Sequence, residues 1–517
     1  MGVDNPGATA GPNSTVATPS ESTQSQRGEY DGQPQGKQPL SKRILAVIWD
    51  SLDKTPKQRA LIAKLDWWIL SYVCVAYFVK YLDQTNVSNA YVSGMREGLN
   101  LKGNDLNLLT TYWTIGYIIG QFPSQMIMTK IPPSIWLPTC ELIWSVFTIA
   151  IAGAKTKETV FAFRFFIGLF EASAYVGIMT LLGSWYTPAE LGKRACIFQA
   201  SSSAAQMFSG YLQAALYKGM NGQAGLPAWK WLFVFDGIFG IPIALYGFWA
   251  IPDSPTTCKS RWMNAEEKEL AIKRMEQVGR KPATKVTLGT FKQVFLGWPV
   301  WLFSGAFICH VLGIRIYSYF NVWLKSTNRW SVEEVNLIPT AGYGLQIFFT
   351  LCYAWASDAI RMRAPVITFA CVIAVIGCII LSIWPSDNIP AMMTGWFLTF
   401  CETGAGALFM TWINEVCGFS QEHRIIVIAI VETMAYTFQA WVPLLAFNTG
   451  EAPHFKYGYQ LAAMFFALEI VFVAVMLCAE RGNWYKGLDG EENDAENSGH
   501  VDDRTSSTTD ERDVIKA

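Results

Sequence analysis

An arginine and a glutamate lie seven positions apart in the otherwise apolar stretch "RFFIGLFEA", residues 164–172. On insertion scales a charged side chain costs about 3 kcal/mol at the centre of a membrane helix, so two in one helix need a purpose. Arg164 carries a fixed charge that can bind a carboxylate, and Glu171 can take up a proton. Two helical turns separate them, so they share one face roughly 10 Å apart. This spacing suits an anion held between them. The alternative is that each pairs with a neighbouring helix and only stabilises the bundle.

Further ionisable and aromatic residues lie in other apolar runs. We expect Arg315, in "CHVLGIRIYSYFNVW", to bind the anion from the opposite side. Asp83 is expected at the outer end of its helix, where capping, gating and proton coupling all stay open, and His310 is expected to be structural. Because a bilayer disfavours ionised carboxylates, an acid beside a fixed arginine favours joint binding of proton and anion. The candidate substrate-binding residues are Arg164, Arg315, Tyr319, Trp113 and Tyr112, and the candidate proton-coupling residues are Glu171, Asp83 and Glu402.

Motifs for other chemistry are missing from the sequence. It has no G-x-x-x-x-G-K-[ST] loop, so it contains no P-loop ATPase, and its four histidines form no H-x-x-x-H pattern. C-x-x-C and G-x-S-x-G are absent too. We therefore expect no enzyme activity, cofactor or metal site. Eleven cysteines, most in apolar runs, argue against structural disulfides. Transport must be secondary, or powered by a partner.

The composition is that of an all-α membrane protein. Hydrophobic residues make up 51% of the chain and charged residues only 16%, where a soluble chain carries about 25%. A membrane-spanning helix needs roughly 20 apolar residues. Runs of this length predict twelve transmembrane helices, near 66–86, 106–128, 134–153, 158–183, 195–217, 231–250, 298–324, 337–357, 364–384, 389–413, 424–447 and 459–480.

Charge in the loops predicts the orientation. With both termini cytosolic, 28 of the 40 Lys and Arg residues fall on the inner side and nine on the outer side. The basic residues form no nucleic-acid patch. The predicted organisation has five parts: 1–65, a disordered cytosolic N-terminus with a short amphipathic stretch; 66–250, a six-helix bundle; 251–297, a cytosolic linker with a short surface helix; 298–480, a second six-helix bundle; and 481–517, a disordered acidic tail.

Two six-helix sets suggest an internal repeat, with a binding site between the halves. Aligning Glu171 with Glu402 sets "FFIGLFEASA" against "WFLTFCETGA", and Arg164 then falls opposite Gly395, so only the first half carries the cation. Gly116 and Gly120 have the spacing that lets helices pack closely.

Several stretches resemble one transporter family. These are "YLDQTNVSNAYVSGM" (81–95), "YWTIGYIIGQFPSQMIMTK" (112–130), "RFFIGLFEA", "SWYTPAELGKRA" (184–195) and "IPDSP" (251–255). They are similar to the major facilitator superfamily and, within it, to the anion:cation symporter branch, the fungal allantoate permease family, with pantothenate and other vitamin carriers most alike. The resemblance implies a twelve-helix major facilitator fold, a cavity lined by spans one, four, seven and ten, and proton-coupled uptake of an organic anion. It also places Arg164 and Glu171 on the charged positions of span four.

The loops after spans two and eight look like the family's cytosolic gate. The first keeps only Lys130 as a basic residue, whereas the second, "WASDAIRMR", keeps Asp358, Arg361 and Arg363. The span-five signature of proton-exchanging exporters is absent from residues 200–210, which favours import.

The sequence therefore predicts a multi-pass carrier, in the plasma membrane and monomeric, for proton-coupled uptake of a small pantothenate-like carboxylate. Its partners are the anion, the proton and the lipid bilayer, without nucleic acid. Two alternatives stay open: an exporter or intracellular carrier of an anionic secondary metabolite, and a nutrient sensor that does not transport.

Overall fold

The computed structural model describes residues 54–128, 130–277, 288–360, 362–385, 387–417 and 421–482. The chain divides into two units, Met1–Arg59 and Ala60–Ala517, and the fold described below is that of the second. The predicted acidic tail from residue 483, and the N-terminal tail with its amphipathic stretch up to residue 53, lie outside the described residues.

Each predicted membrane span is helical over most of its length, with breaks at residues 172–173 and 401–404. Residues 54–250 form α3 (Pro56–Leu65), η1 (Asp66–Leu70), α4 (Ser71–Ala90), η2 (Tyr91–Met95), α5 (Arg96–Gly98), α6 (Asp105–Met128), α7 (Pro133–Gly153), α8 (Lys157–Glu171), α9 (Ala174–Trp185), α10 (Pro188–Met220), η3 (Gln223–Gly225) and α11 (Ala228–Ala250).

The linker carries α12 (Ala265–Gln277), which is the predicted surface helix, and α13 (Leu288–Leu296). The second half forms α14 (Trp298–Ile314), η4 (Arg315–Tyr319), α15 (Phe320–Ser326), α16 (Val332–Ile360), α17 (Ala364–Ile383), α18 (Ile389–Phe400), α19 (Ala405–Val416), α20 (Gln421–Ala446), η5 (Thr449–Glu451) and α21 (Gly458–Arg481).

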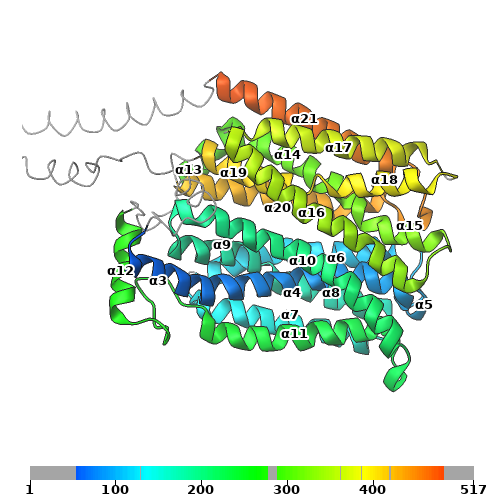
Figure 1. The fold of residues 1–517 in the computed structure, drawn as a ribbon, viewed down its shortest axis with the longest axis horizontal. Helices are drawn as coiled ribbons and strands as arrows, with labels where there is room; N and C mark the ends of the chain where they lie inside the picture. The colour runs from blue at the N-terminus through cyan, green and yellow to red at the C-terminus, as the bar shows by residue number, and fades with distance from the viewer. Residues whose placement is uncertain are drawn as a thin grey trace, which may run out of the picture. The chain divides into compact units, whose positions relative to one another are not determined.

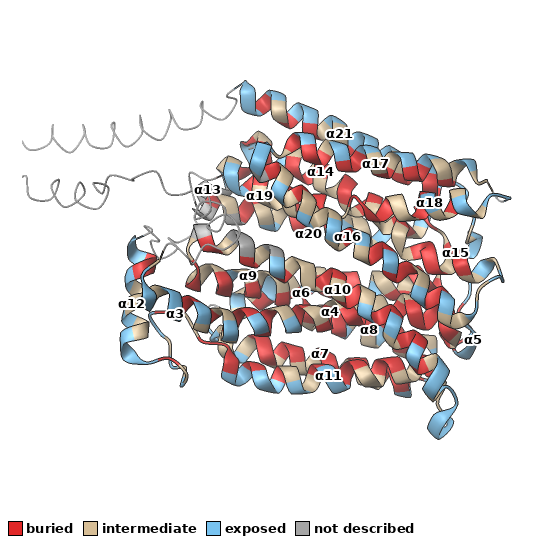
Figure 2. Ribbon diagram, in the orientation of Figure 1, coloured by how far each residue is buried: buried red, intermediate tan, exposed pale blue. Residues whose placement is uncertain are grey.

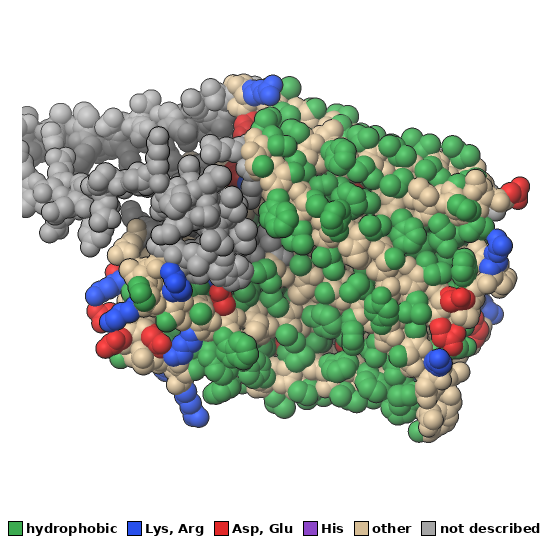
Figure 3. Space-filling model, viewed as in Figure 1, with side chains coloured by type: hydrophobic (Ala, Val, Ile, Leu, Met, Phe, Trp, Pro, Cys, Tyr) green, Lys and Arg blue, Asp and Glu red, His purple; other side chains and the backbone are tan. Residues whose placement is uncertain are grey.

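Within the described ranges, nine helical segments are long and apolar enough to cross a bilayer. The other three predicted spans lie in α6, α10 and α18–α19, which are also helical. Large apolar side chains such as Phe122 and Trp355 are more than two-thirds exposed. Figure 3 shows hydrophobic side chains across the middle of one face and charged side chains at its two ends. Such a band of exposed apolar surface is what contact with lipid requires.

First-half helices α4–α11 pack mainly with one another, and so do second-half helices α14–α21. The two sets lie one above the other in Figure 1, and contacts of α10 with α16 and of α6 with α20 join them. Buried residues are concentrated where helices face each other, as Figure 2 shows. The site is therefore expected along the seam between the halves.

The start of the first span differs from the prediction. Residues 56–65, assigned to the disordered N-terminal part, form α3, whose sequence PKQRALIAKL is rich in helix-forming residues. Its residue Lys64 pairs with Glu267 of α12 at 2.8 Å. Partial burial opposes ionisation of this glutamate, but the hydrogen bonds from Lys64 and the Asn264 backbone outweigh it, so the pKa of Glu267 lies below its ordinary value.

Close packing of α6 against α8 fixes the helices that carry the candidate site. A Cβ atom at Gly116 would collide with the Phe165 backbone, and one at Gly168 would collide with the Trp113 backbone. The prediction that Gly116 and Gly120 are packing residues is confirmed, because a Cβ at Gly120 would also meet backbone atoms of α8.

Polar contacts join the two halves at the α5 end of the bundle. Asn107 of α6 donates to the carbonyl of Phe447 at 2.6 Å, and the hydroxyl of Tyr319 donates to Asn107 at 2.7 Å. Asn104 donates to the Leu444 carbonyl at 2.7 Å. Both carbonyls lie at the end of α20, where backbone acceptors have no partner within the helix. These contacts close the seam at this end.

Replacing Gly168 by alanine should lower thermal stability, because the added methyl group meets backbone rather than a movable side chain. Overpacking of this kind costs about 1–3 kcal/mol. We expect a melting temperature several degrees lower, measured on the purified full chain in detergent. Gly344→Ala is the matched control: it lies in helix α16 with nothing within 4 Å of the added atom, so it should be neutral or slightly stabilising. Equal melting temperatures for the two variants would contradict this packing.

Candidate functional site

Three of the candidate residues lie where a helix is interrupted. Glu171 is the last residue of α8, and two residues separate it from the start of α9. Arg315 opens the 3-10 segment η4 between α14 and α15, and Glu402 lies between α18 and α19. Interrupted helices leave backbone groups and side chains free to contact a bound solute near the membrane midplane. The interruptions thus mark the level at which a site is expected.

Arg164 forms a buried ion pair with Asp83. Its Nη1 lies 2.7 Å from Asp83 Oδ2, and the two residues are 2% and 1% exposed. Thr148 donates to the other carboxylate oxygen at 3.2 Å. Asp83 was expected at the outer end of its span, but the helix continues through η2 and α5 to Gly98, which places Asp83 well inside it. Arg164 thus pairs with a neighbouring helix, and it also lines the cavity described below.

Glu171 accepts hydrogen bonds from two neighbours through one of its oxygens. The indole N–H of Trp113 donates at 2.9 Å and the amide of Gln84 at 3.3 Å, both to Oε2. The other oxygen, Oε1, is buried and has no hydrogen-bond partner in the described part of the chain. A protonated Glu171 would place its hydroxyl on that oxygen.

A cavity lies between the two halves, next to both arginines. Its empty space, including the open mouth, is about 810 Å³. The lining is mostly polar. It consists of Tyr81, Gln84, Thr85, Ser88, Asn89, Thr110, Trp113, Arg164, Gln206, Gly210, Arg315, Tyr317, Ser318, Asn321, Asn336, Pro339, Tyr343 and Gln439.

The two arginines of this cavity differ in their partners. Arg164 is neutralised by Asp83, as described above. Arg315, half-buried, makes no hydrogen bond or ion pair with any residue that the structure describes, whereas Arg164 is paired through its Nη1. The Nε of each arginine is a buried donor without an acceptor. A buried donor that lacks an acceptor is destabilising unless a ligand supplies one. Arg315 is therefore the cation of the cavity that is available to an anion.

The aromatic candidates lie in three different environments. Trp113 lines the cavity. Tyr112 is 39% exposed and stacks on Phe161 with the ring centroids 5.1 Å apart, outside the cavity lining. Tyr319 is buried, bonds to Asn107 and stacks on Phe447, so it takes part in the contacts that join the halves instead of lining the cavity. Sequence spacing could not separate these roles, because all three are aromatic residues on interior helices.

Glu402 lies outside the cavity and contacts His310. Its Oε1 is 2.6 Å from His310 Nδ1, and Glu469 lies on the other side of the ring nitrogen. These three buried residues could hold a metal ion, since one ligand atom from each lies within 4.8 Å of the others. The expectation that His310 is a hydrogen-bonded residue agrees with this contact.

The predicted gate residues lie only partly within the described structure. Lys130 is exposed. Arg363 pairs with Glu415 at 2.8 Å and donates to Ser357 at 2.6 Å, so it joins helices of the second half to one another. Arg361 and the side chain of Asp358 lie outside the described residues.

Two buried charged residues near the site were not selected as site residues from the sequence. Lys80 of α4 is 2% exposed, with its Nζ 4.6 Å from the ring centroid of Tyr117 and 3.4 Å from its hydroxyl. Asp236 of α11 accepts from the Asn86 amide at 3.0 Å. Each is an isolated charge in an apolar run, so the signal that singled out Arg164 was present for both.

A chain of polar side chains continues from Asp236 to the second half. Asn86 accepts from Ser209 at 2.6 Å, Ser209 accepts from Asn89 at 2.7 Å, and Asn89 accepts from Asn321 at 3.1 Å. The last two residues of the chain line the cavity. Hydrogen bonds satisfied in series hold these side chains in place within an apolar surrounding.

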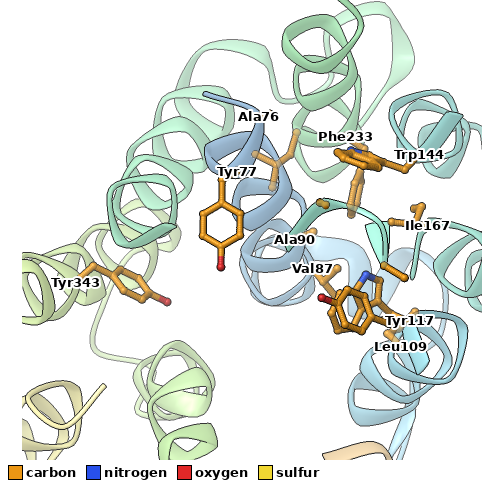
Figure 4. Packing of buried hydrophobic residues seen from close by; sticks show 14 of the residues in the cluster. Ala76, Tyr77, Val87, Ala90, Leu109, Tyr117, Trp144, Ile167, Phe233 and Tyr343 are labelled. Atoms are coloured by element: carbon orange, nitrogen blue, oxygen red, sulfur yellow. The ribbon is translucent and has the colours of Figure 1, made fainter. Parts of the chain in front are cut away.

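A buried cluster of aromatic and aliphatic residues packs next to the polar site. Figure 4 shows Trp144 and Phe233 packed among the first-half helices near Ile167, and Tyr343 reaching toward them from α16. All four belong to one buried hydrophobic cluster. Tyr343 also lines the cavity, so the cluster extends to its wall.

The sequence matches known transporters over most of its length. It is 38% identical over 427 residues to the MFS transporter PfmaC of Pestalotiopsis fici, which covers 81% of this chain and 79% of that protein. It is 34% identical to the pantothenate transporter liz1 of Schizosaccharomyces pombe, over 81% of each chain.

The fold matches known transporters as well. The proton:xylose symporter XylE, solved with 6-bromo-6-deoxy-D-glucose, superimposes with a TM-score of 0.60 at 14% identity, over 79% of this chain and 95% of that one. The model of the Major Facilitator Superfamily matches residues 73–326. This chain therefore belongs to the major facilitator superfamily and is a multi-pass membrane transporter, not an enzyme.

Proposed function

We propose that this protein is a secondary transporter that couples the uptake of a small organic carboxylate, of the pantothenate class, to protons. One observation carries the proposal: Arg315 lines the cavity without a hydrogen bond or ion pair to any described residue, while Arg164 across the cavity is neutralised by Asp83. The cavity thus offers one uncompensated positive charge. A single carboxylate compensates it and can bind the guanidinium fork through two oxygens.

The rest of the lining favours an anion with a polar body. Amide side chains contribute from both halves: Gln84, Asn89, Gln206, Asn321, Asn336 and Gln439. Such groups both donate and accept hydrogen bonds, so they suit a substrate that carries hydroxyl and amide groups beside its carboxylate. Pantothenate has this chemistry, and the 34% identity to a pantothenate transporter supports the choice. The anion:cation symporter branch is the corresponding subfamily.

Glu171 is the proposed proton carrier of the first half. It is buried, and the residues that donate to it, Trp113 and Gln84, both line the cavity. Loss or gain of a proton on Glu171 therefore changes hydrogen bonds on the cavity wall. Asp83 is the second candidate, because protonating it would release Arg164 to the substrate.

The proposal includes the arrangement in the membrane. Twelve helices cross it, six from residues 66–250 and six from 298–480, and the excess of Lys and Arg places both termini and the linker in the cytosol. The α5 end then faces outward, and the Asn104 and Asn107 contacts hold the outer side closed. The plasma membrane is the proposed location and a monomer the working unit, and Lys130, Asp358, Arg361 and Arg363 belong to the proposed cytosolic gate.

Replacing Arg315 by alanine should abolish saturable uptake of labelled pantothenate in cells that lack their own carrier. Removing one member of a desolvated charge pair costs about 2 kcal/mol or more, which corresponds to an apparent KM at least about 30-fold higher. Arg315→Lys keeps the positive charge but loses the forked guanidinium, so its apparent KM should lie between those of wild type and Arg315→Ala. Arg329→Ala is the control, because Arg329 is exposed and outside the cavity.

Biotin and nicotinate serve as competitors in the same assay. If pantothenate is not taken up despite surface expression, the proposed substrate is wrong. Accumulation of an anionic compound inside cells that lack the protein would then indicate export. Normal uptake by Arg315→Ala would remove the observation on which the proposal rests.

Uptake should be faster at about pH 5 than at about pH 7.5, because the lower pH favours the protonated form of buried carboxyls on the loaded carrier. A protonophore should abolish accumulation. Glu171→Gln mimics the protonated form, so this variant should exchange substrate across the membrane but lose concentrative, pH-dependent uptake. Unchanged pH dependence in Glu171→Gln would exclude this residue as a proton carrier.

Asp83→Asn should lower thermal stability strongly, since it leaves the Arg164 charge buried without its partner. Breaking a buried pair in this way costs about 3–5 kcal/mol. The double variant Asp83→Asn with Arg164→Gln removes both charges and should recover most of the melting temperature, but not transport. A double variant less stable than Asp83→Asn alone would contradict the pairing.

A further inference from the structure

A second group of buried ionisable residues lies in the second half, away from the cavity. His310 of α14, Glu402 and Glu469 of α21 are 3%, 0% and 0% exposed. His310 Nδ1 is 2.6 Å from Glu402 Oε1 and 3.6 Å from Glu469 Oε1. None of the three lines the cavity. We call these residues the histidine cluster.

The histidine cluster has more acceptors than donors. Glu402 Oε2 and both carboxylate oxygens of Glu469 are buried and have no hydrogen-bond donor among the described residues. The imidazole faces both carboxylates through one nitrogen, Nδ1, which carries at most one hydrogen. Glu469 Oε1 lies 3.6 Å from the ring nitrogen, beyond hydrogen-bonding distance, and the thiol of Cys371, a weak donor, faces the same carboxylate. The histidine cluster therefore lacks a strong donor for its second carboxyl group.

The charges do not balance either. With both glutamates ionised, a protonated His310 leaves the cluster with one net negative charge, and a neutral His310 leaves it with two. An uncompensated charge in such a buried site costs several kcal/mol. The other titratable groups that face the cluster carry no charge as thiols or phenols: they are Cys309, Cys371, Cys378, Tyr353 and Tyr317.

We propose that the histidine cluster is a proton-binding site, separate from the substrate cavity, which holds two protons among its three side chains. One proton lies on His310, hydrogen-bonded to Glu402. The second lies on a carboxyl of Glu402 or Glu469 and supplies the missing donor. The two neighbouring carboxyls then hold one proton between them, as close carboxyl pairs do, and the remaining negative charge is balanced by protonated His310. This site goes beyond the proposed function, because it does not depend on which anion is carried.

The geometry favours a proton over a metal ion. At 2.6 Å the Nδ1 atom is at hydrogen-bonding distance from Glu402 Oε1, shorter than two ligand atoms around one ion would sit, since metal–ligand bonds are about 2.0–2.2 Å long and diverge from the ion. The rings of Phe307 and Phe409 flank the imidazole, with centroids 5.7 and 5.8 Å away, and keep its surroundings apolar. Gly406 allows this position of the ring, because a Cβ there would lie 2.7 Å from His310 Nε2.

Infrared difference spectroscopy of the full chain in lipid vesicles tests the site directly. A protonated carboxyl has a C=O stretch distinct from that of a carboxylate, and its frequency shifts when H₂O is exchanged for D₂O. We expect wild type to show one protonated-carboxyl band at neutral pH that is missing from Glu469→Gln. The same band should be missing from Glu402→Gln. In each variant the one remaining carboxylate is balanced by protonated His310, so no second proton is bound. Glu158→Gln, at an exposed position of α8, should leave the band intact.

Gly406→Ala is a second variant that changes no ionisable group. It should displace the imidazole and shift the band instead of removing it, which keeps the test valid if Glu469→Gln does not fold. Difference spectra without a protonated-carboxyl band would overturn the proposal. So would one metal ion per chain in purified wild type that is absent from Glu469→Gln. If the protonated-carboxyl band is present but uptake does not depend on protons, the proposed function is wrong and the proton-binding site is still supported.

Discussion

The buried ion pair between Arg164 and Asp83 is the interaction on which the rest of the site depends. A guanidinium inside a bilayer must be compensated, and here a carboxylate from α4 compensates it at 2.7 Å. That pairing leaves Arg315 as the cation of the cavity with no partner among described residues. The proposed preference for a single negative charge rests on this difference between the two arginines.

Backbone contact between α6 and α8 gives this arrangement its rigidity. With glycines at the crossing, the helices approach until Trp113 of one reaches Glu171 of the other. At the α5 end the halves are joined differently, by side-chain amides such as Asn107 that donate to carbonyls at the end of α20. Hydrogen bonds to carbonyls at a helix end can be exchanged for water when the end opens, whereas separating the glycine contacts would leave a void. The first contact suits a fixed element and the second a seam that opens.

Each half has a buried glutamate at a similar place in its helices. Glu171 and Glu402, which the alignment of the two segments pairs, both lie where a helix is interrupted. Around Glu171 the nearby basic residues are Lys80 and Arg164. Around Glu402 the nearby basic residue is His310, whose imidazole titrates near neutrality in water. The two aligned glutamates therefore have different basic partners, a lysine and an arginine in one half and an imidazole in the other.

The sequence alone determined the helical class, the twelve apolar segments and the presence of Arg164, Glu171 and Arg315 in them, because isolated charges in long apolar runs are visible without a structure. It also indicated the glycine crossing, through the four-residue spacing of Gly116 and Gly120. Only the tertiary structure decided the pairings. Asp83 meets Arg164 from 81 residues away, Glu469 meets His310, and Tyr112 and Tyr319 turn away from the cavity. Which partner a buried charge finds depends on how helices are rotated and tilted against each other, and helical periodicity does not fix that rotation.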